Sequence, residues 1–182
     1  TRLQPVVMQL GQAAGALAAL ACIEDKGVKE IGVRQVQEKL LDSGCYIMPY
    51  LDLPKSDPHF KAMQRIGATG VLRGEGRNVG WSNETWFRAD EPLRGEEIYA
   101  SELYGAITVD PGAISVGRML ELVRSYGGRV PYGKMADWWK QLGLNDFNAE
   151  RTATRLEAAV VIDAAFDPFG MFEVDYKGYF TR

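Results

Sequence analysis

Residues that commonly form metal sites and disulfide frameworks are scarce in this sequence. Its 182 residues include two cysteines, one histidine and no Cys-x-x-Cys pair. Cys22 and Cys45 lie in or beside apolar stretches, so we expect buried thiols rather than a disulfide framework. The single histidine, His59, stands beside a predicted helix start, where a surface or capping role is expected. We therefore expect no metal site.

An excess of charge of one sign is missing as well. The net charge is -3, and the 21 lysines and arginines are scattered along the chain. No overall basic field is therefore present to attract nucleic acid or an anionic membrane. Strand patterns are also sparse, apart from weak alternation in residues 171–180. With 46% hydrophobic residues, the chain is predicted to be a globular protein of the mainly α class.

The chain opens on a long apolar segment, Leu3–Ile23, rich in alanine and glycine. Pro5 suits a first helical turn, and we predict a helix from there to about Glu24. Three glutamines interrupt the segment: Gln4, Gln9 and Gln12. Because alanine drives membrane insertion weakly, we expect a helix covered by protein and no membrane span.

Two glycines give this first helix a bare side. Gly11 and Gly15 are four positions apart, so they share one face of the helix. Such a face allows another backbone or a flat ligand to approach closely. Tight helix packing is the alternative interpretation.

Apolar spacing and capping residues predict most of the remaining chain as helices. The expected ranges are 33–41, 58–69, 92–103, 114–126, 132–142, and a last helix capped by Thr152 or Thr154 that ends near Phe166. Residues 71–92 are expected to form a long loop, with the glycines of 74–80 in a turn. Residues 171–180 are expected to be a short strand or an extended tail.

Two stretches of the chain resemble each other. Residues 87–97 and 147–157 both run from a phenylalanine through a short polar loop to a helix entry with an acidic residue. Each follows a helix that ends in glycine. The repeated unit is therefore predicted to be helix, loop, helix, with an insertion in the first copy. Such units bury their apolar faces against one another.

Residues 50–74, followed by 87–97, resemble an S-layer homology (SLH) repeat. The second copy keeps the typical Thr-Arg-x-Glu motif as Thr154–Glu157. The resemblance covers roughly residues 50–166 and implies a bundle of SLH-like helix-loop-helix repeats. Three repeats usually cooperate in that family, and two are visible here.

The first copy departs from the family pattern. Aligned without gaps, Arg94 takes the position of the threonine, Gly95 that of the arginine, and Glu97 that of the glutamate. A one-residue deletion would instead bring Arg94 into register and place Glu96 at the glutamate position.

The SLH resemblance implies binding of an anionic cell-wall polysaccharide, with Thr154, Arg155 and Glu157 as candidate ligand residues. In the alternative interpretation Thr154 caps a helix, and Arg155 and Glu157 are ordinary first-turn residues. Trp81 and Trp86 are further candidates, because aromatic faces beside polar groups suit sugar rings. They are alternatively anchors of a long loop.

The opening segment resembles the last FAD-contacting helix of FAD-dependent oxidoreductases with a glutathione-reductase-like fold. The residues that carry this resemblance are Met8, Gly11, Gln12, Ala13, Ala14, Gly15, Ala18 and Ala19. The resemblance implies that N–H groups around Val6–Gln9 face the negative charge of a reduced flavin. The expected cofactor-binding residues are Val6, Val7, Met8, Gly11, Gln12 and Gly15.

The dinucleotide-binding part of such a domain is not found in this sequence. The nearest string, Gly74–Gly80, lacks the third glycine and the strand-to-helix context. We therefore expect residues 1–26 to be the end of an α/β FAD-binding domain whose remainder is absent, and 28–182 to be an SLH-like helical module. FAD is expected in the parent protein and none in this piece.

The expected function is a non-catalytic docking module at the C-terminal end of a bacterial FAD-dependent oxidoreductase. The alternative is a polysaccharide-binding module of a polysaccharide-processing protein, such as those labelled xanthan lyase. Expected partners are the missing FAD-binding domain and, through the first helix, a second copy. The substrate, the electron acceptor and the compartment stay open.

Overall fold

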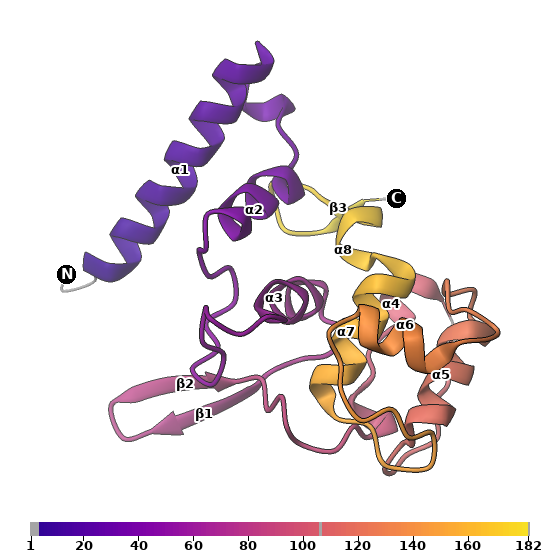
Figure 1. Cartoon of the computed structure of the whole chain (residues 1–182). Helices are drawn as coiled ribbons and strands as arrows, with labels where there is room; N and C mark the ends of the chain where they lie inside the picture. Colours follow the sequence, from indigo (N-terminus) through magenta and orange to yellow (C-terminus); the bar gives the residue numbers. More distant parts are fainter. Residues whose placement is uncertain (1–3, 106, 182) are drawn as a thin grey trace. The chain divides into compact units, whose positions relative to one another are not determined.

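The computed structural model describes residues 4–105 and 107–181 and is mainly helical, as predicted (Figure 1). The chain divides into two compact units. The first unit comprises residues 1–47 and 172–182, and the second comprises residues 48–171. The sequence predicted a boundary at residues 26–28, between the end of an FAD-binding domain and a helical module. A division into compact units does not test that boundary, so it stays a prediction.

In the first unit, α1 (Gln4–Glu24) is followed by the short 3-10 helix η1 (Val28–Glu30) and by α2 (Val33–Asp42). Pro5 lies in the first turn of α1, as expected. Leu20 and Ala21 are the buried residues of α1, and they form a small core with Ile31. α1 is therefore packed only near its C-terminal end.

Two predictions in the first unit have different outcomes. The expected short strand near the C-terminus is confirmed, because β3 (Glu173–Val174) pairs antiparallel with β4 (Phe180–Thr181). The expectation of two buried thiols is half wrong. Cys45 is buried, whereas Cys22 is exposed on the side of α1 that the first unit leaves uncovered.

The second unit contains four helices that the sequence predicted, with bounds that differ by a few residues: α3 (Phe60–Thr69), α5 (Val116–Ser125), α6 (Met135–Gln141) and α7 (Arg155–Phe166). The short α8 (Pro168–Met171) follows α7. Figure 1 shows α3 lying across α7. Arg65 of α3 ties the two helices together through an ion pair of 2.9 Å with Asp163 and a second one with Asp167.

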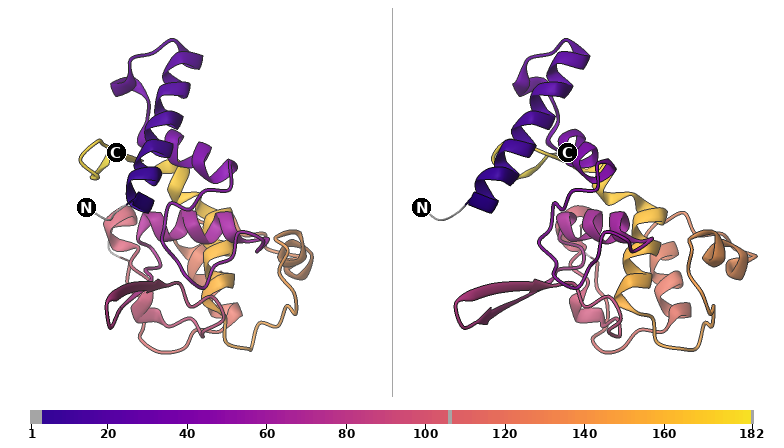
Figure 2. Two further views of the ribbon diagram at one scale, coloured as in Figure 1. Left: turned by 90° about the vertical axis from the view of Figure 1, so that its left-hand side faces the viewer. Right: turned by 60° about the vertical axis from the view of Figure 1, so that its left-hand side comes forward.

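The predicted loop over residues 71–92 is wrong, because most of it is a β-hairpin. β1 (Glu75–Val79) pairs antiparallel with β2 (Ser82–Trp86), with Glu75 opposite Trp86. Figure 2 shows this hairpin extending from the rest of the second unit. Gly80 has φ of 58°, which suits the first position of a two-residue hairpin turn. β1 is exposed throughout, so it carries no hydrophobic alternation for sequence reasoning to detect.

The predicted helix over residues 92–103 is also wrong. This stretch holds a 3-10 turn, η2 (Gly95–Glu97), and a single helical turn, α4 (Ser101–Tyr104). Its backbone instead forms isolated bridges, pairing Arg94 with Ala113 and Ile98 with Leu72. The polar, glutamate-rich composition favoured a helix, but tertiary pairing of the backbone overrides that preference.

Three extended segments meet in a closed triangle of backbone hydrogen bonds. The N–H of Leu93 donates to Ala153 O at 2.7 Å, that of Ala153 to Ile114 O at 2.9 Å, and that of Ile114 to Leu93 O at 3.0 Å. All three residues are buried. Three further hydrogen bonds join the same segments in the opposite sense, each from a residue two positions after the first set to a residue two positions before it: Gly95 N–H to Gly112 O, Val116 N–H to Arg151 O and Arg155 N–H to Glu91 O. The segments are therefore arranged with approximate threefold symmetry.

Each of the three segments leads into a helix entry. The residues before η2, α5 and α7 are Arg94, Ser115 and Thr154. Arg94 N–H donates to Glu97 Oε2 at 3.2 Å, as Thr154 N–H does to Glu157 Oε2 at 2.8 Å. These matching contacts support the alignment without gaps. The helix entry at Ser115 takes the equivalent place in both sets of backbone hydrogen bonds. Sequence comparison missed it because Thr108 and Arg118 stand where the two copies have phenylalanine and glutamate.

One glycine shows how closely these segments approach. A Cβ added to Gly95 would lie 1.9 Å from the carbonyl oxygen of Asp110. No side chain fits there, so the first copy has glycine where the second copy has Arg155. The three helix entries are thus similar in backbone and different in side chains.

Candidate functional site

The residues expected to contact a flavin lie along the first half of α1, and most of them are exposed. Val6, Val7 and Met8 are 48%, 64% and 74% exposed. Leu10 is 65% exposed. Apolar side chains of this size at consecutive positions on one helix are a surface that protein or lipid normally covers.

The glycines of α1 keep the bare face that the sequence predicted. A Cβ added to Gly11 or to Gly15 would meet no atom within 4 Å. Nothing in the described part of the first unit therefore needs glycine at these two positions. Gln12, by contrast, is engaged, because its Nε2 donates to Cys45 Sγ at 2.9 Å. Five of the six expected flavin contacts are thus on the uncovered part of α1, and Gln12 is turned toward Cys45.

α1 also has the features of a membrane-spanning helix. Among the described residues it is the helix that is long and apolar enough to cross a membrane, by length and composition alone. A core helix of a soluble protein passes the same test. In this chain only Leu20 and Ala21 of the helix are buried. The first unit therefore leaves most of this helix uncovered.

The two tryptophans expected at a sugar site are separated by the hairpin. Trp81 lies in the turn and is fully exposed, whereas Trp86 ends β2 at the base. Trp86 is also engaged: its Nε1 donates to Glu84 at 3.1 Å, and the guanidinium of Arg88 lies 4.9 Å from its ring centroid. The hairpin therefore does not bring Trp81 and Trp86 to one surface.

Thr154 and Glu157 form a capping box at the start of α7. Thr154 Oγ1 accepts from Glu157 N at 3.2 Å, and Glu157 Oε2 accepts from Thr154 N at 2.8 Å. The prediction that Thr154 caps this helix is confirmed. Arg151 adds an ion pair to Glu157, with Nη1 donating to Oε2 at 2.9 Å. The hydrogen bond that Arg151 donates to Glu157 raises the pKa of Arg151.

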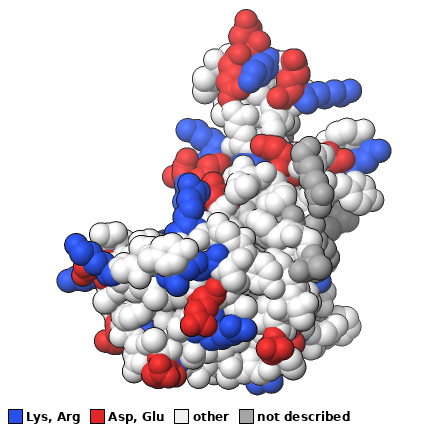
Figure 3. Space-filling view, turned by 90° about the vertical axis from the view of Figure 1, so that its right-hand side faces the viewer, with Lys and Arg blue, Asp and Glu red and all other residues white. Residues whose placement is uncertain are grey.

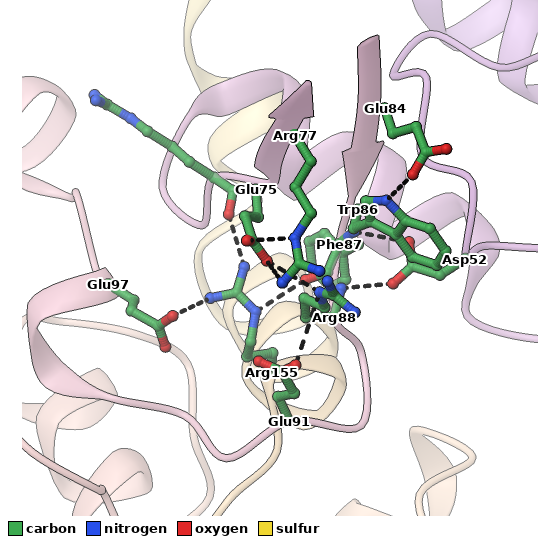
Figure 4. A network of polar contacts seen from close by, with 11 residues as sticks. Asp52, Glu75, Arg77, Glu84, Trp86, Phe87, Arg88, Glu91, Glu97 and Arg155 are labelled. Carbon is green, nitrogen blue, oxygen red and sulfur yellow. Dashed lines mark hydrogen bonds and ion pairs between the residues drawn. The ribbon is translucent and has the colours of Figure 1, made fainter. Parts of the chain in front are cut away.

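Arg155 is not an ordinary first-turn residue, contrary to the alternative interpretation. Its side chain is 4% exposed. Nε donates to Phe87 O at 2.9 Å, Nη2 to Arg73 O at 2.7 Å, and Nη1 lies 3.1 Å from Glu97 Oε1 (Figure 4). A polysaccharide would reach this guanidinium only after these internal contacts were broken. The geometry describes a structural arginine that joins the hairpin base to two helix entries.

The same network fixes the chain as it leaves the hairpin. Asp52 accepts the N–H groups of Phe87 and Arg88, each at 2.7 Å. Arg88 Nε in turn contacts Glu75 Oε2 at 3.1 Å (Figure 4). The hydrogen bond from Arg77, followed by that from Arg88, lowers the pKa of the Glu75 carboxyl. Sequence reasoning missed Asp52, whose acidic side chain within a proline-rich connector was the available signal.

Ionisable groups in the described residues do not gather into a metal site. No group of three or more His, Cys, Asp or Glu side chains suits a metal ion in residues 4–105 and 107–181. On the face drawn in Figure 3, acidic and basic side chains are interspersed. The ion pairs described above are contacts between elements of the fold.

The residues present fit an FAD molecule only in part. The first turn of α1 offers backbone N–H groups, and its bare face offers close approach. The Gly-x-Gly string at residues 74–76 leads into β1 of the hairpin, so it is no phosphate-binding loop. The described residues therefore fit one edge of a flavin, and residues 74–76 do not fit its phosphates.

A family model described as FAD dependent oxidoreductase matches residues 1–40, less than a quarter of the chain. No curated protein and no solved structure matches the chain. The matched residues contain α1, η1 and most of α2, which belong to the first unit.

Proposed function

We propose that α1 is the last helix of the FAD-binding domain of a FAD-dependent oxidoreductase, and that the rest of the chain is a non-catalytic module that docks on that domain. The observation that carries this proposal is the uncovered apolar first half of α1. This half of α1 lies within the residues that the FAD dependent oxidoreductase model matches. The partner is therefore the FAD-binding domain, and the cofactor is FAD.

The backbone at the amino end of α1 supports this assignment. A helix of 21 residues has unpaired N–H groups and a partial positive charge at its first turn. When FAD is bound, reduced flavin places negative charge beside its N1 and O2 atoms. Amide groups near Val6 and Val7 would stabilise that charge without a cationic side chain. Gly11 and Gly15 would let the helix lie close against the dinucleotide domain.

An SLH-like ancestry of residues 50–166 is part of the same proposal. Three segments with matching helix entries around one axis support it, since SLH repeats usually act in threes. The internal engagement of Arg155 favours a structural role over polysaccharide binding at this position. We therefore propose a docking module, with wall binding as the alternative.

The proposal is tested on the product of the complete reading frame that encodes this chain. The purified protein should carry FAD, seen as visible flavin absorbance. Gly15→Leu should abolish or strongly weaken FAD retention there, because the added side chain would separate α1 from its domain. In the 182-residue chain the same change should be neutral or stabilising by up to about 1 kcal/mol, since nothing lies near Gly15.

Gly76→Leu is the matched control, because a Cβ on this exposed hairpin residue also meets nothing within 4 Å. It should leave flavin content unchanged. A complete gene product without flavin would contradict the proposal. Detergent-dependent solubility with α1 protected in lipid vesicles would instead identify a membrane span, and a dimer disrupted by Gly15→Leu would identify a second copy as the partner.

A further inference from the structure

The C-terminal hairpin presents two tyrosines on an ordered turn. Tyr176 and Tyr179 are 88% and 69% exposed. Asp175 Oδ1 accepts the N–H groups of Lys177 at 2.8 Å and of Tyr179 at 2.9 Å, and the N–H of Asp175 donates to Tyr179 O at 2.9 Å. Gly178 has φ of 90°, which closes the turn. The backbone that carries these two exposed tyrosines is thus fixed by its own hydrogen bonds.

The hairpin is anchored on α2 by a buried arginine. Arg34 is 4% exposed, and its Nε donates to Phe172 O at 3.2 Å. Its guanidinium carbon lies 5.7 Å from the ring centroid of Phe180. Burying an arginine is costly unless it is hydrogen-bonded, so this side chain is committed to holding the C-terminal segment on α2.

A second anchor lies at the amino end of α2. Glu173 approaches Gly32 so closely that an added Cβ would be 3.2 Å from its Oε2. Gly32 is the N-cap of α2, where a negative charge is favourable. Both anchoring residues of α2, Gly32 and Arg34, lie within the segment that matches the FAD dependent oxidoreductase model. The hairpin is therefore attached to the flavin-related part of the chain.

We propose that the β3–β4 hairpin is a second contact surface for the FAD-binding domain, with Tyr176 and Tyr179 as its anchoring side chains. This inference rests on the proposed function of α1. Tyrosine is enriched at protein interfaces, where it buries a large ring and loses little side-chain entropy. The ordered turn lowers the cost of binding further, because its backbone is already fixed.

Hydrogen exchange in the hairpin tests this inference. The amides of residues 173–181 should exchange about tenfold more slowly in the complete gene product than in the 182-residue chain. Two tyrosine anchors worth about 1 kcal/mol each would account for at least that factor. The double variant Tyr176→Ala/Tyr179→Ala should remove the slowing. Tyr132→Ala, which changes a tyrosine of the second unit that is 90% exposed, should leave it intact.

The outcomes separate this inference from the proposed function. A flavin-loaded complete protein whose hairpin exchanges as fast as in the 182-residue chain overturns the inference and leaves the function of α1 standing. Slowing that appears in the 182-residue chain as its concentration rises, with dimer formation, assigns the tyrosines to a second copy and also overturns it. A complete protein without flavin overturns both.

Discussion

The backbone N–H of Leu93 donates to the carbonyl oxygen of Ala153 at 2.7 Å, although the two residues belong to different copies of the repeated unit. Ile114 completes the triangle between them. A closed ring of this kind needs all three segments, so the second unit is expected to unfold as one cooperative body. Leu93 and Ala153 are both fully buried, with 0% of each residue exposed.

Enlarging the side chain on the axis should destabilise the protein. Ala153→Leu is expected to lower the free energy of unfolding by about 1–3 kcal/mol, because the added atoms must displace two neighbouring segments. Urea denaturation followed by circular dichroism measures the change. Ala136→Leu, at an exposed position of α6, should stay within about 0.5 kcal/mol. Equal effects of both changes would show that the axis is not closely packed.

Removing the guanidinium of Arg155 should cost more. Arg155→Met leaves the carbonyl oxygens of Phe87 and Arg73 without a donor and Glu97 without its ion pair. The expected loss is about 3 kcal/mol in the free energy of unfolding. Arg118→Met is the control, because Arg118 is exposed and pairs with Glu121 only at the surface. A loss below 1 kcal/mol for Arg155→Met would mean that the guanidinium is free for a ligand.

The three helix entries should respond differently to loss of the capping side chain. Thr154→Ala and Ser115→Ala each remove a hydroxyl that accepts a backbone N–H, so each should cost about 0.5–2 kcal/mol. Arg94→Ala removes no side-chain cap and should stay within about 0.5 kcal/mol. The three values come from the same denaturation experiment. A similar cost at all three positions would contradict the assignment of the caps.

Glu96 should make stability depend on pH in the acid range. Hydrogen bonding from the backbone N–H of Gly112, with further help from Arg94, lowers the pKa of Glu96 from 4.5 to about 2. A lowered folded pKa means that the charged form stabilises the fold above about pH 4.5. That contribution fades as the pH falls toward 2.

The comparison is between the native chain and Glu96→Gln, measured as urea midpoints across this pH range. The native chain should be the more stable of the two at pH 6, and the difference should shrink between pH 4.5 and 2. The other carboxyl groups titrate in both proteins and cancel. A difference that is constant with pH would show that the Glu96 carboxylate is not the stabilising group.

Sequence reasoning succeeded where one helix face or one cap decides the structure. The apolar spacing of Phe60, Met63 and Ile66 predicted α3, and Thr154 predicted the start of α7. Sequence reasoning failed where the structure is decided by backbone pairing between segments that are far apart in the sequence. Residues 92–103 have a helix-like composition, and β1 has only exposed residues, so neither carries a local signal of its structure.

The same difference between local signals and long-range contacts decides which candidate sites could be predicted. The exposed first half of α1 was predictable, because a small-residue face and apolar residues without polar alternation are visible in the sequence. The burial of Arg155 was not predictable, because its partners at Arg73, Phe87 and Glu97 come from other elements. The equivalent segment before Ser115 was hidden, because Thr108 and Arg118 replace the shared phenylalanine and glutamate while the bonds that join the three segments are made by backbone atoms.

Hydrogen exchange at the amino end of α1 tests the central claim most directly. The measurement compares the complete gene product with bound FAD and after removal of FAD. If the first turn of α1 faces the flavin, the amides of Val6–Gln9 should exchange markedly more slowly when FAD is bound, while those near Leu20 stay unchanged because this chain already buries that end. Equal exchange at Val6–Gln9 with and without FAD would contradict the account.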